Sequence, residues 1–345
     1  MVHILVQLTQ EEMDMRLEHE NKDSVISDAI LSFKMRNYLQ EIIYNMHPEE
    51  KKTSLFFFED KSRTFWHYIP IDRVGLSIEK ATRKTVNRIF QLLALLLSDT
   101  GYLLVEKIMN HEMILKSIEE KDGISRWPRS NQRYWFSIYG SPEDNRVAWK
   151  FEGHHISINC LLIDHQIIIT PLFWGANPAN VKEGTNNGLR ILSPIEDLAR
   201  QLILSFNKQQ LSKVLIEDNA PRDLLTTNQR QIFLKKPSGI ALNDMLLEQQ
   251  KLFLKLINWY FNTTTKTLAS SLLTNMKNSN SGSIYFAWAG GTSFGMPHYY
   301  CIQGANMFIE YDCVQDNANH IHSVVRDSKK DFGDDILMQH RKTMH

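Results

Sequence analysis

Cysteine is scarce in this sequence, and its spacing excludes the frameworks that cysteine-rich proteins use. The 345 residues include three cysteines, Cys160, Cys301 and Cys313, and no two of them form a C-x-x-C pair. An odd set without that spacing argues against a disulfide framework and against a cysteine-rich zinc site. We therefore expect free thiols in a reducing compartment, and hence a cytoplasmic protein.

An excess of charge of either sign is also lacking. Lysine and arginine together number 39, and so do aspartate and glutamate. Such a balance creates no broad positive field that would attract a phosphate backbone or an anionic lipid surface. We expect neither nucleic acid nor a membrane as a partner, and a small molecule as the substrate, while the sequence leaves the oligomeric state open.

Long hydrophobic runs and the common nucleotide motifs are missing as well. The most apolar stretch, residues 89–97, covers about nine residues, whereas a helix that spans a bilayer needs roughly 20. Residues 1–10 lack the positive start and the small-residue cleavage site of a signal peptide. No G-K-[ST] phosphate loop, G-x-G-x-x-G fingerprint or G-x-S-x-G elbow occurs. The sequence thus predicts no transmembrane helix, and it argues against a dinucleotide enzyme and a serine hydrolase.

Apolar residues are plentiful, and their periodicity predicts an α+β fold. They make up 43% of the chain, which is enough for a sizeable core. Helical spacing predicts helices near residues 24–45, 78–98, 102–120, 194–211, 242–261 and 266–276. Alternating runs predict strands near residues 134–140, 147–160, 161–173, 283–290, 298–304, 306–312 and 320–326. We expect an antiparallel sheet of strands from the middle and C-terminal segments, packed with several amphipathic helices, with an N-terminal helical segment at 1–50 and a single α+β domain at 51–345.

Three connections between these elements have distinctive sequences. Residues 53–70 resemble two short strands around a charged turn, as in a hairpin. Gly101 is expected to end the helix before it in a left-handed conformation. Residues 173–192 are rich in glycine, asparagine and proline, and a loop of about 15 residues suggests a functional role. We predict that this loop contacts the substrate.

The segment Trp149-Lys-Phe-Glu-Gly-His-His155 is a first candidate for chemistry. Strand alternation predicts that Glu152 and His154 lie on one face and His155 on the other. A carboxylate beside an imidazole can bind a divalent metal or act as an acid and base. The alternative is a hydrogen-bonded strand histidine without a chemical role.

A second candidate combines two short strands that each carry polar residues at positions i and i+2. Glu310 and Asp312 lie on one strand, and His320 and His322 lie on the next. An H-x-H pair with a carboxylate from a neighbouring strand can form a metal site that keeps an open position. The alternatives are a metal-free polar site and a solvated sheet face.

These patterns lead to one main hypothesis and two rivals. In the main hypothesis the protein is a metal-dependent enzyme, hydrolytic or oxidative, whose divalent ion (iron, manganese, zinc or copper) is bound by His154, Glu310, His320 and His322. The predicted catalytic residues are Glu152, Asp312 and His155, and the predicted substrate-binding residues are Arg190, Asn177, His298, Gln303 and Arg326. Because arginine forks bind carboxylates and phosphates, we expect an anionic substrate. The rivals are a metal-free binding module for a sugar or organic acid, and an interaction protein whose N-terminal helices dock a partner.

Many of the same residues form motifs that resemble the domain-of-unknown-function family DUF3500, over about residues 57–340. The matching segments are Trp66–Pro70, Gly75–Leu76, Trp149–His155, Gly175–Ala179, Gly188–Arg190, Phe286–Gly290, Pro297–Tyr300, Ile302–Gly304, Glu310–Asp312, Ala318–Ser323, Arg326–Asp327 and Asp331–Gly333. The resemblance implies one family domain over nearly the whole chain, and it supplies no reaction.

The sequence departs from the family pattern at three places. Cys301 stands where the family has arginine, Cys313-Val314 where it has Asn-Thr, and Val325 where it has tryptophan. If the family's arginine binds substrate, the substrate of this member differs. The candidate metal ligands fit the pattern, so the departures leave the metal hypothesis intact.

Overall fold

The computed structural model of the protein describes residues 27–124, 127–277 and 284–334. Within these ranges, thirteen strands join one sheet, in the order β1-β3-β4-β5-β7-β13-β12-β11-β10-β8, with β2 on β3, β6 on β5 and β9 on β10. The strands are β1 (Leu55–Phe56), β2 (Leu76–Ser77), β3 (Tyr134–Tyr139), β4 (Arg146–Gly153), β5 (Ile156–Ile163), β6 (Gln166–Ile168), β7 (Leu172–Ala176), β8 (Leu215–Glu217), β9 (Ile240–Ala241), β10 (Tyr285–Gly290), β11 (His298–Gln303), β12 (Met307–Val314) and β13 (His320–Asp327).

The predicted α+β class is confirmed, but a purely antiparallel sheet is not. β1 pairs with β3 in parallel, and β8 pairs with β10 in parallel, each at one end of the sheet. The predicted hairpin at residues 53–70 is wrong, because only β1 is extended there and a short 3-10 helix, Lys61–Arg63, follows it. The sheet is therefore mixed.

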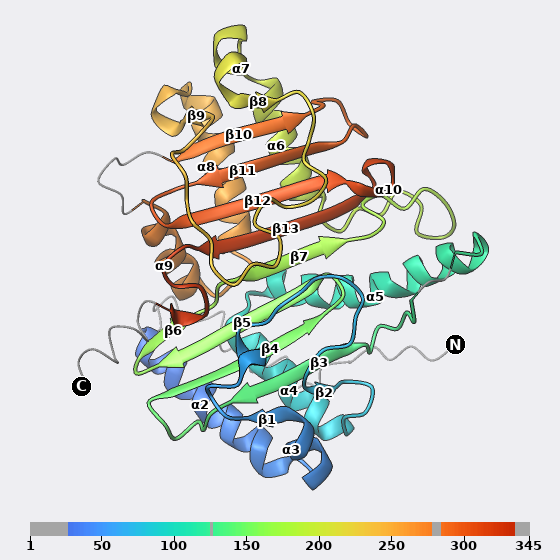
Figure 1. Ribbon diagram of the computed structural model, residues 1–345, viewed down its shortest axis with the longest axis vertical. Coiled ribbons are helices and arrows are strands. Elements are labelled where there is room, and N and C mark those ends of the chain that lie inside the picture. Colours follow the sequence, from blue (N-terminus) through green and yellow to red (C-terminus); the bar gives the residue numbers. More distant parts are fainter. Residues whose placement is uncertain (1–26, 125–126, 278–283, 335–345) are drawn as a thin grey trace.

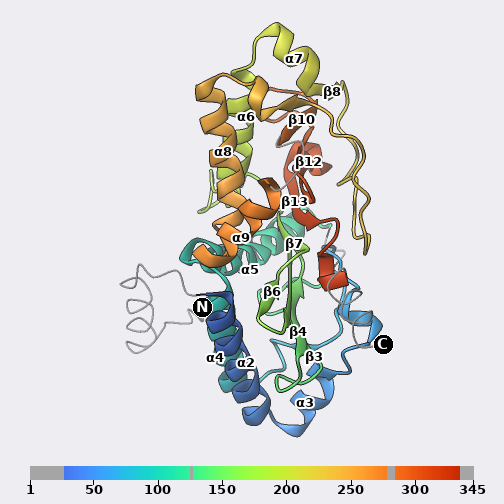
Figure 2. The same ribbon diagram turned by 90° about the vertical axis from the view of Figure 1, so that its left-hand side faces the viewer.

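Helices cover one face of the sheet (Figures 1 and 2). They are α2 (Asp28–Asn45), α4 (Arg83–Leu96), α5 (Asp99–Lys121), α6 (Ser193–Leu204), α8 (Leu247–Phe261) and α9 (Lys266–Lys277), while the short α3 (Pro48–Ser54) and α7 (Lys208–Val214) lie toward the ends of the molecule and α10 (Gln315–Ala318) joins β12 to β13. The main hydrophobic core fills the space between these helices and the sheet. This core includes buried residues of α2 such as Leu31 and Leu39. The predicted boundary at residue 50, between an N-terminal helical segment and the α+β domain, stays a prediction.

Two predicted helix boundaries differ from those in the structure, and the residues at the helix ends explain both differences. Gly101 does not end a helix but lies in the first turn of α5, which Ser98 caps by accepting from the Gly101 N–H. A Cβ at Gly101 would stand 1.8 Å from the Thr263 carbonyl oxygen, so the glycine permits a close approach of two backbones. The single helix predicted at 194–211 is two helices, and Asn207 caps the second one.

The other face of the sheet is covered by mostly irregular chain, mainly residues 57–75, which include the 3-10 helix Lys61–Arg63, and residues 218–239 (Figures 1 and 2). We call it the irregular face. A smaller apolar cluster attaches these segments to the strands, and its members are Trp66, Tyr68, Phe173, Leu224, Val324 and Phe332. None of the described helices is long and apolar enough to cross a membrane.

Candidate metal centre

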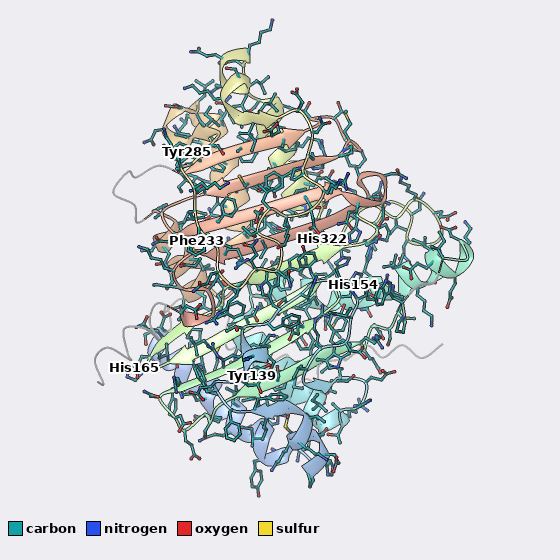
Figure 3. The ribbon with its side chains drawn as sticks, viewed as in Figure 1. Tyr139, His154, His165, Phe233, Tyr285 and His322 are labelled. Carbon is teal, nitrogen blue, oxygen red and sulfur yellow. The ribbon has the colours of Figure 1, made fainter. Side chains whose placement is uncertain are left out.

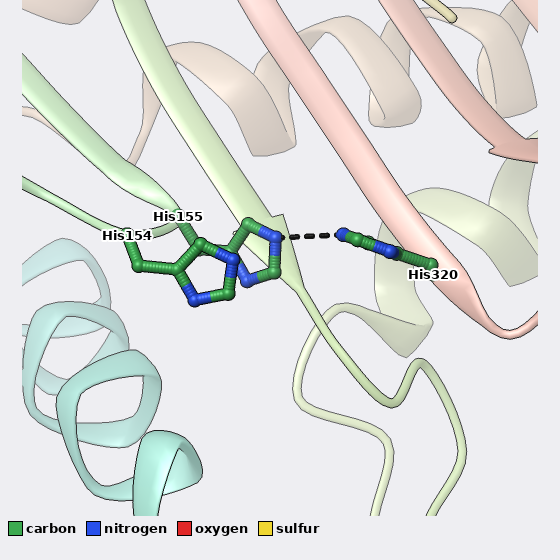
Figure 4. A group of neighbouring side chains, drawn as sticks. All are labelled: His154, His155 and His320. Carbon is green, nitrogen blue, oxygen red and sulfur yellow. Dashed lines mark hydrogen bonds between the residues drawn. The ribbon is translucent and has the colours of Figure 1, made fainter. Parts of the chain in front are cut away.

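Four histidines meet near the middle of the sheet. His154 and His322 are labelled in Figure 3, and Figure 4 shows His154, His155 and His320. His154 and His155 form the turn between β4 and β5, and His320 and His322 begin β13. The rings of His154 and His155 stack with their centroids 3.6 Å apart, and those of His320 and His322 lie 4.5 Å apart. All four side chains are buried. Two segments separated by 165 residues thus bring four imidazoles together.

Strand alternation explains why His320 and His322 share one face of the sheet. Ile321 and Val325 of the same strand pack into the helix-side core, whereas Val324 belongs to the apolar cluster of the irregular face. Because side chains alternate along a strand, even-numbered residues of β13 face the irregular segments. The prediction that His320 and His322 lie on the same face is confirmed, and their role as metal ligands stays a prediction.

The prediction that His155 points away from His154 is wrong. β4 ends at Gly153, and His155 has a φ of 63°, so the alternation of the strand does not extend to it. Its N–H donates to the Tyr68 carbonyl oxygen, and its own carbonyl accepts from the Gly175 N–H of β7. A Cβ on Gly175 would lie 2.6 Å from Cδ2 of His155, so only glycine leaves room for this ring.

Two acidic side chains orient two of the imidazoles. Asp316 Oδ2 lies 3.0 Å from Nδ1 of His320, and the Glu112 carboxylate of α5 contacts Nδ1 of His154. Since a carboxylate accepts the N–H, the contact with Asp316 favours the proton on Nδ1 of His320 and a lone pair on its Nε2. Nδ1 of His154 lies between the Glu112 carboxylate and the Arg129 guanidinium, which is 3.1 Å away. Burial opposes ionisation of Glu112, but the nearby His154 and Arg129 outweigh it and hold the pKa of Glu112 below its ordinary value.

Three imidazoles converge as an uncharged group. Nε2 of His155 and Nε2 of His320 are 2.8 Å apart (Figure 4), and one nitrogen of each of His154, His155 and His320 lies within 4.8 Å of the others. Burial lowers the pKa of all three histidines, to about 4 for His320. Two nitrogens at about 2.0 to 2.1 Å from one ion lie about 2.9 to 3.4 Å apart at angles of 90° to 110°. The His155–His320 separation is close to that range.

A second group lies beside the first and consists of Asp223, Asp312 and His322. Oδ1 of Asp223 accepts from the Tyr68 hydroxyl at 3.1 Å and from the Leu224 N–H at 2.8 Å, and it lies 3.2 Å from Nδ1 of His322. Burial alone would lower the pKa of His322, but the two carboxylates raise it to about 9. Asp312 is fully buried, and burial raises its pKa to about 6.

Two predicted carboxylates have other partners than the histidines. The Glu310 carboxylate accepts from the N–H groups of Leu225 and Thr226 and from the Tyr299 hydroxyl, so it anchors the irregular segment to the sheet. Glu152 lies 2.6 Å from the ammonium of Lys150 and also pairs with Arg73. Neither belongs to a group of converging ligands among the described residues.

Of the five predicted substrate-binding residues, one lies at the histidine cluster and four have partners elsewhere. Asn177 does lie at the cluster, where its Nδ2 donates to Asp316 and stands 3.2 Å from Nδ1 of His320. The other four are engaged elsewhere: Arg190 with Glu196 and Asp197, Arg326 with Asp331, Gln303 with the Lys235 carbonyl oxygen, and His298 with the Met296 carbonyl oxygen and the Trp288 ring on the helix-covered face.

Sequence reasoning missed Glu112, Asp223 and Asp316. Glu112 lies on a helix and Asp223 in an irregular segment, and neither is near a histidine in the motifs that led to the prediction. Only Asp316 had a usable signal, because it lies four residues before His320.

The chain belongs to the DUF3500 family of proteins of unknown function, whose model matches residues 30–334. The family match therefore includes every histidine and carboxylate of the cluster. No curated protein and no solved structure matches the chain significantly.

Proposed function

We propose that the protein is a metal-dependent enzyme in which His154, His155 and His320 bind one divalent ion. The observation that carries this proposal is the convergence of three buried imidazoles, two of which have a carboxylate on the outer nitrogen. Metal-binding histidines in proteins usually have such a carboxylate, because it fixes the tautomer and strengthens the ligand. His155 and His320 are hydrogen-bonded through their Nε2 atoms, so a bound ion would take the place of the proton between them.

The ligand set favours hydrolysis. Three neutral imidazoles leave the double charge of the ion undiminished, and a fourth position can hold water whose pKa falls to about 7. Asp223 and Asp316 are the partly exposed carboxylates of the cluster, and they give the released proton a route to solvent. Iron or copper on the same ligands would instead support oxidation, so the identity of the ion decides between the two reactions.

The substrate we propose is a small molecule without a strong negative charge. The expectation of an anionic substrate rested on Arg190 and Arg326, and both bind carboxylates of the protein. The exposed rim of the cluster consists of Asn177, Asp223 and Asp316, which favours a neutral or positively charged group.

Elemental analysis of protein purified without a metal-affinity column tests the proposal. We expect bound zinc, manganese, iron or copper in the wild type and its loss from His155→Gln and His320→Gln. His165→Gln is the matched control, because His165 is an exposed histidine at the β5–β6 turn (Figure 3). Absence of metal from the folded wild type after reconstitution would refute the proposal and favour a metal-free binding module.

A further inference from the structure

Asp312 is a buried carboxylate for which the described chain provides no hydrogen bond. Its exposed fraction is 0%, and neither of its oxygens has a hydrogen-bond partner. The nearest cationic nitrogen is Nδ1 of His322, at 3.6 Å from Oδ2, which is beyond hydrogen-bonding distance. His322 lies between Asp223 and Asp312, and its single positive charge faces two carboxylates, so a net negative charge remains in this buried group, which is unfavourable.

Apart from His322, the buried cationic side chains of the irregular face have other partners. Arg73 and Lys150 pair with Glu152, Arg326 pairs with Asp331, and Arg63 donates to the Phe58 and Phe332 carbonyl oxygens. Asp312 faces Asp223 and His322 instead, and one ligand atom of each of the three lies within 4.8 Å of the others. We infer that a second divalent cation binds between Asp223, Asp312 and His322 and forms a two-metal centre with the ion on the three histidines.

The surroundings hold these ligands in place. The Tyr68 hydroxyl and the Leu224 N–H fix the Asp223 carboxylate, and the ring of Tyr68 packs against that of His322 with centroids 4.7 Å apart. The two ligand groups are neighbours, because His322 lies 4.5 Å from His320 between ring centroids. In two-metal hydrolases the ions lie about 3.5 to 4 Å apart, so the two ions must be bound by neighbouring groups of ligands.

The two sites differ in ligand chemistry. Three neutral imidazoles form the first, whereas two carboxylates and one imidazole form the second, which suits manganese, zinc or iron. Two metal ions at neighbouring sites can stabilise the attacking oxygen and the leaving oxygen of a hydrolysis at the same time. The inference thus rests on the proposed function and narrows it to hydrolysis of an ester or amide bond.

Metal counting with Mn²⁺ tests the second site separately from the first. We would reconstitute wild type, Asp312→Asn and His155→Gln with Mn²⁺, count ions per chain, and record electron paramagnetic resonance spectra. We expect two ions and a spin-coupled spectrum in the wild type, and one uncoupled ion in each variant. Glu310→Gln is the control, since it removes the next carboxylate on the same face of β12 and should keep two ions.

The outcomes distinguish the two proposals. One uncoupled ion in the wild type that is retained in Asp312→Asn and lost in His155→Gln would overturn the second site and leave the proposed function standing. No ion in the wild type would overturn both. Two ions retained in Asp312→Asn would overturn the assignment of Asp312. The wild-type count and spin coupling do not depend on any variant, so they decide the matter even if Asp312→Asn fails to fold.

Discussion

Replacing Asp312 by asparagine should make the metal-free protein more stable, although it removes a buried residue of the candidate centre. The carboxylate has a pKa of about 6 in the folded chain because it is buried, against an ordinary value of 3.8. A folded-state pKa above the unfolded value means that the folded chain binds the proton more tightly. The contribution of Asp312 to the free energy of unfolding is therefore greatest below about pH 4 and falls as the pH rises to about 6. Asparagine has nearly the same shape and no charge, so it abolishes this loss.

The size of the effect follows from the same pKa values. The difference between 3.8 and about 6 corresponds to about 3 kcal/mol of lost stability at neutral pH. At about 2.1 cal/mol/K per residue, the unfolding entropy of 345 residues is about 0.7 kcal/mol/K. Metal-free Asp312→Asn should thus melt up to about 4 °C above metal-free wild type at pH 7. The advantage should vanish near pH 4.

Metal should remove this advantage. An ion at a hundred times its Kd stabilises the site that binds it by about 2.7 kcal/mol, or about 4 °C here. Wild type gains this increment from the second ion and Asp312→Asn does not, so the two loaded proteins should melt at nearly the same temperature. Calorimetry in chelator and in excess Mn²⁺ measures both differences, with Asp122→Asn, an exposed change of the same type, as control. A metal-free variant that melts below wild type, or an advantage that persists in Mn²⁺, would refute the reasoning.

Three further substitutions test the surroundings of the centre by melting curves and metal titration. Gly175→Ala places a Cβ 2.6 Å from the His155 ring, so it should cost about 1 to 3 kcal/mol and weaken metal binding about tenfold or more; unchanged affinity would contradict the role of this glycine. Glu112→Gln should weaken metal binding about 10- to 100-fold, because it removes the carboxylate from its histidine, whereas Glu119→Gln, which alters the same arginine network, should not. Glu310→Gln should cost about 2 kcal/mol, because charge-assisted hydrogen bonds are lost, and should leave metal content unchanged; loss of metal would restore the earlier prediction of a ligand.

Strand alternation predicted much of the fold because strands are local patterns. The runs that became β3, β10, β11 and β12 have apolar residues at alternate positions, and the structure confirms these strands and β13, where Ser323 interrupts the pattern. The aromatic run before residue 70 misled the prediction, since Trp66 and Tyr68 pack in an apolar cluster without being strand residues. Pairing between distant strands, such as β1 with β3, leaves no mark in a local pattern.

The candidate site was predictable only where its residues are close together in sequence. The H-x-H pair of β13 and the adjacent histidines of the β4–β5 turn were visible as patterns. Their convergence depends on the pairing of β7 with both β5 and β13, which a single sequence does not reveal. Glu310 and Asp312 are both acidic residues on the same face of β12, and their different roles come from the segments that pack against them. The irregular segment gives Glu310 three hydrogen-bond donors and gives Asp312 none.

The candidate metal centre lies where β7 joins the two parts of the sheet. This five-residue strand connects the part of the sheet from β1 to β5 with the part from β13 to β8. The histidines flank it, with His154 and His155 on the β5 side and His320 and His322 on the β13 side. An ion bound by histidines from both sides of β7 would link the two parts of the sheet, so that they unfold as one cooperative unit. Removal of that ion would then leave the short strand, and the core behind it, as the link that resists their separation.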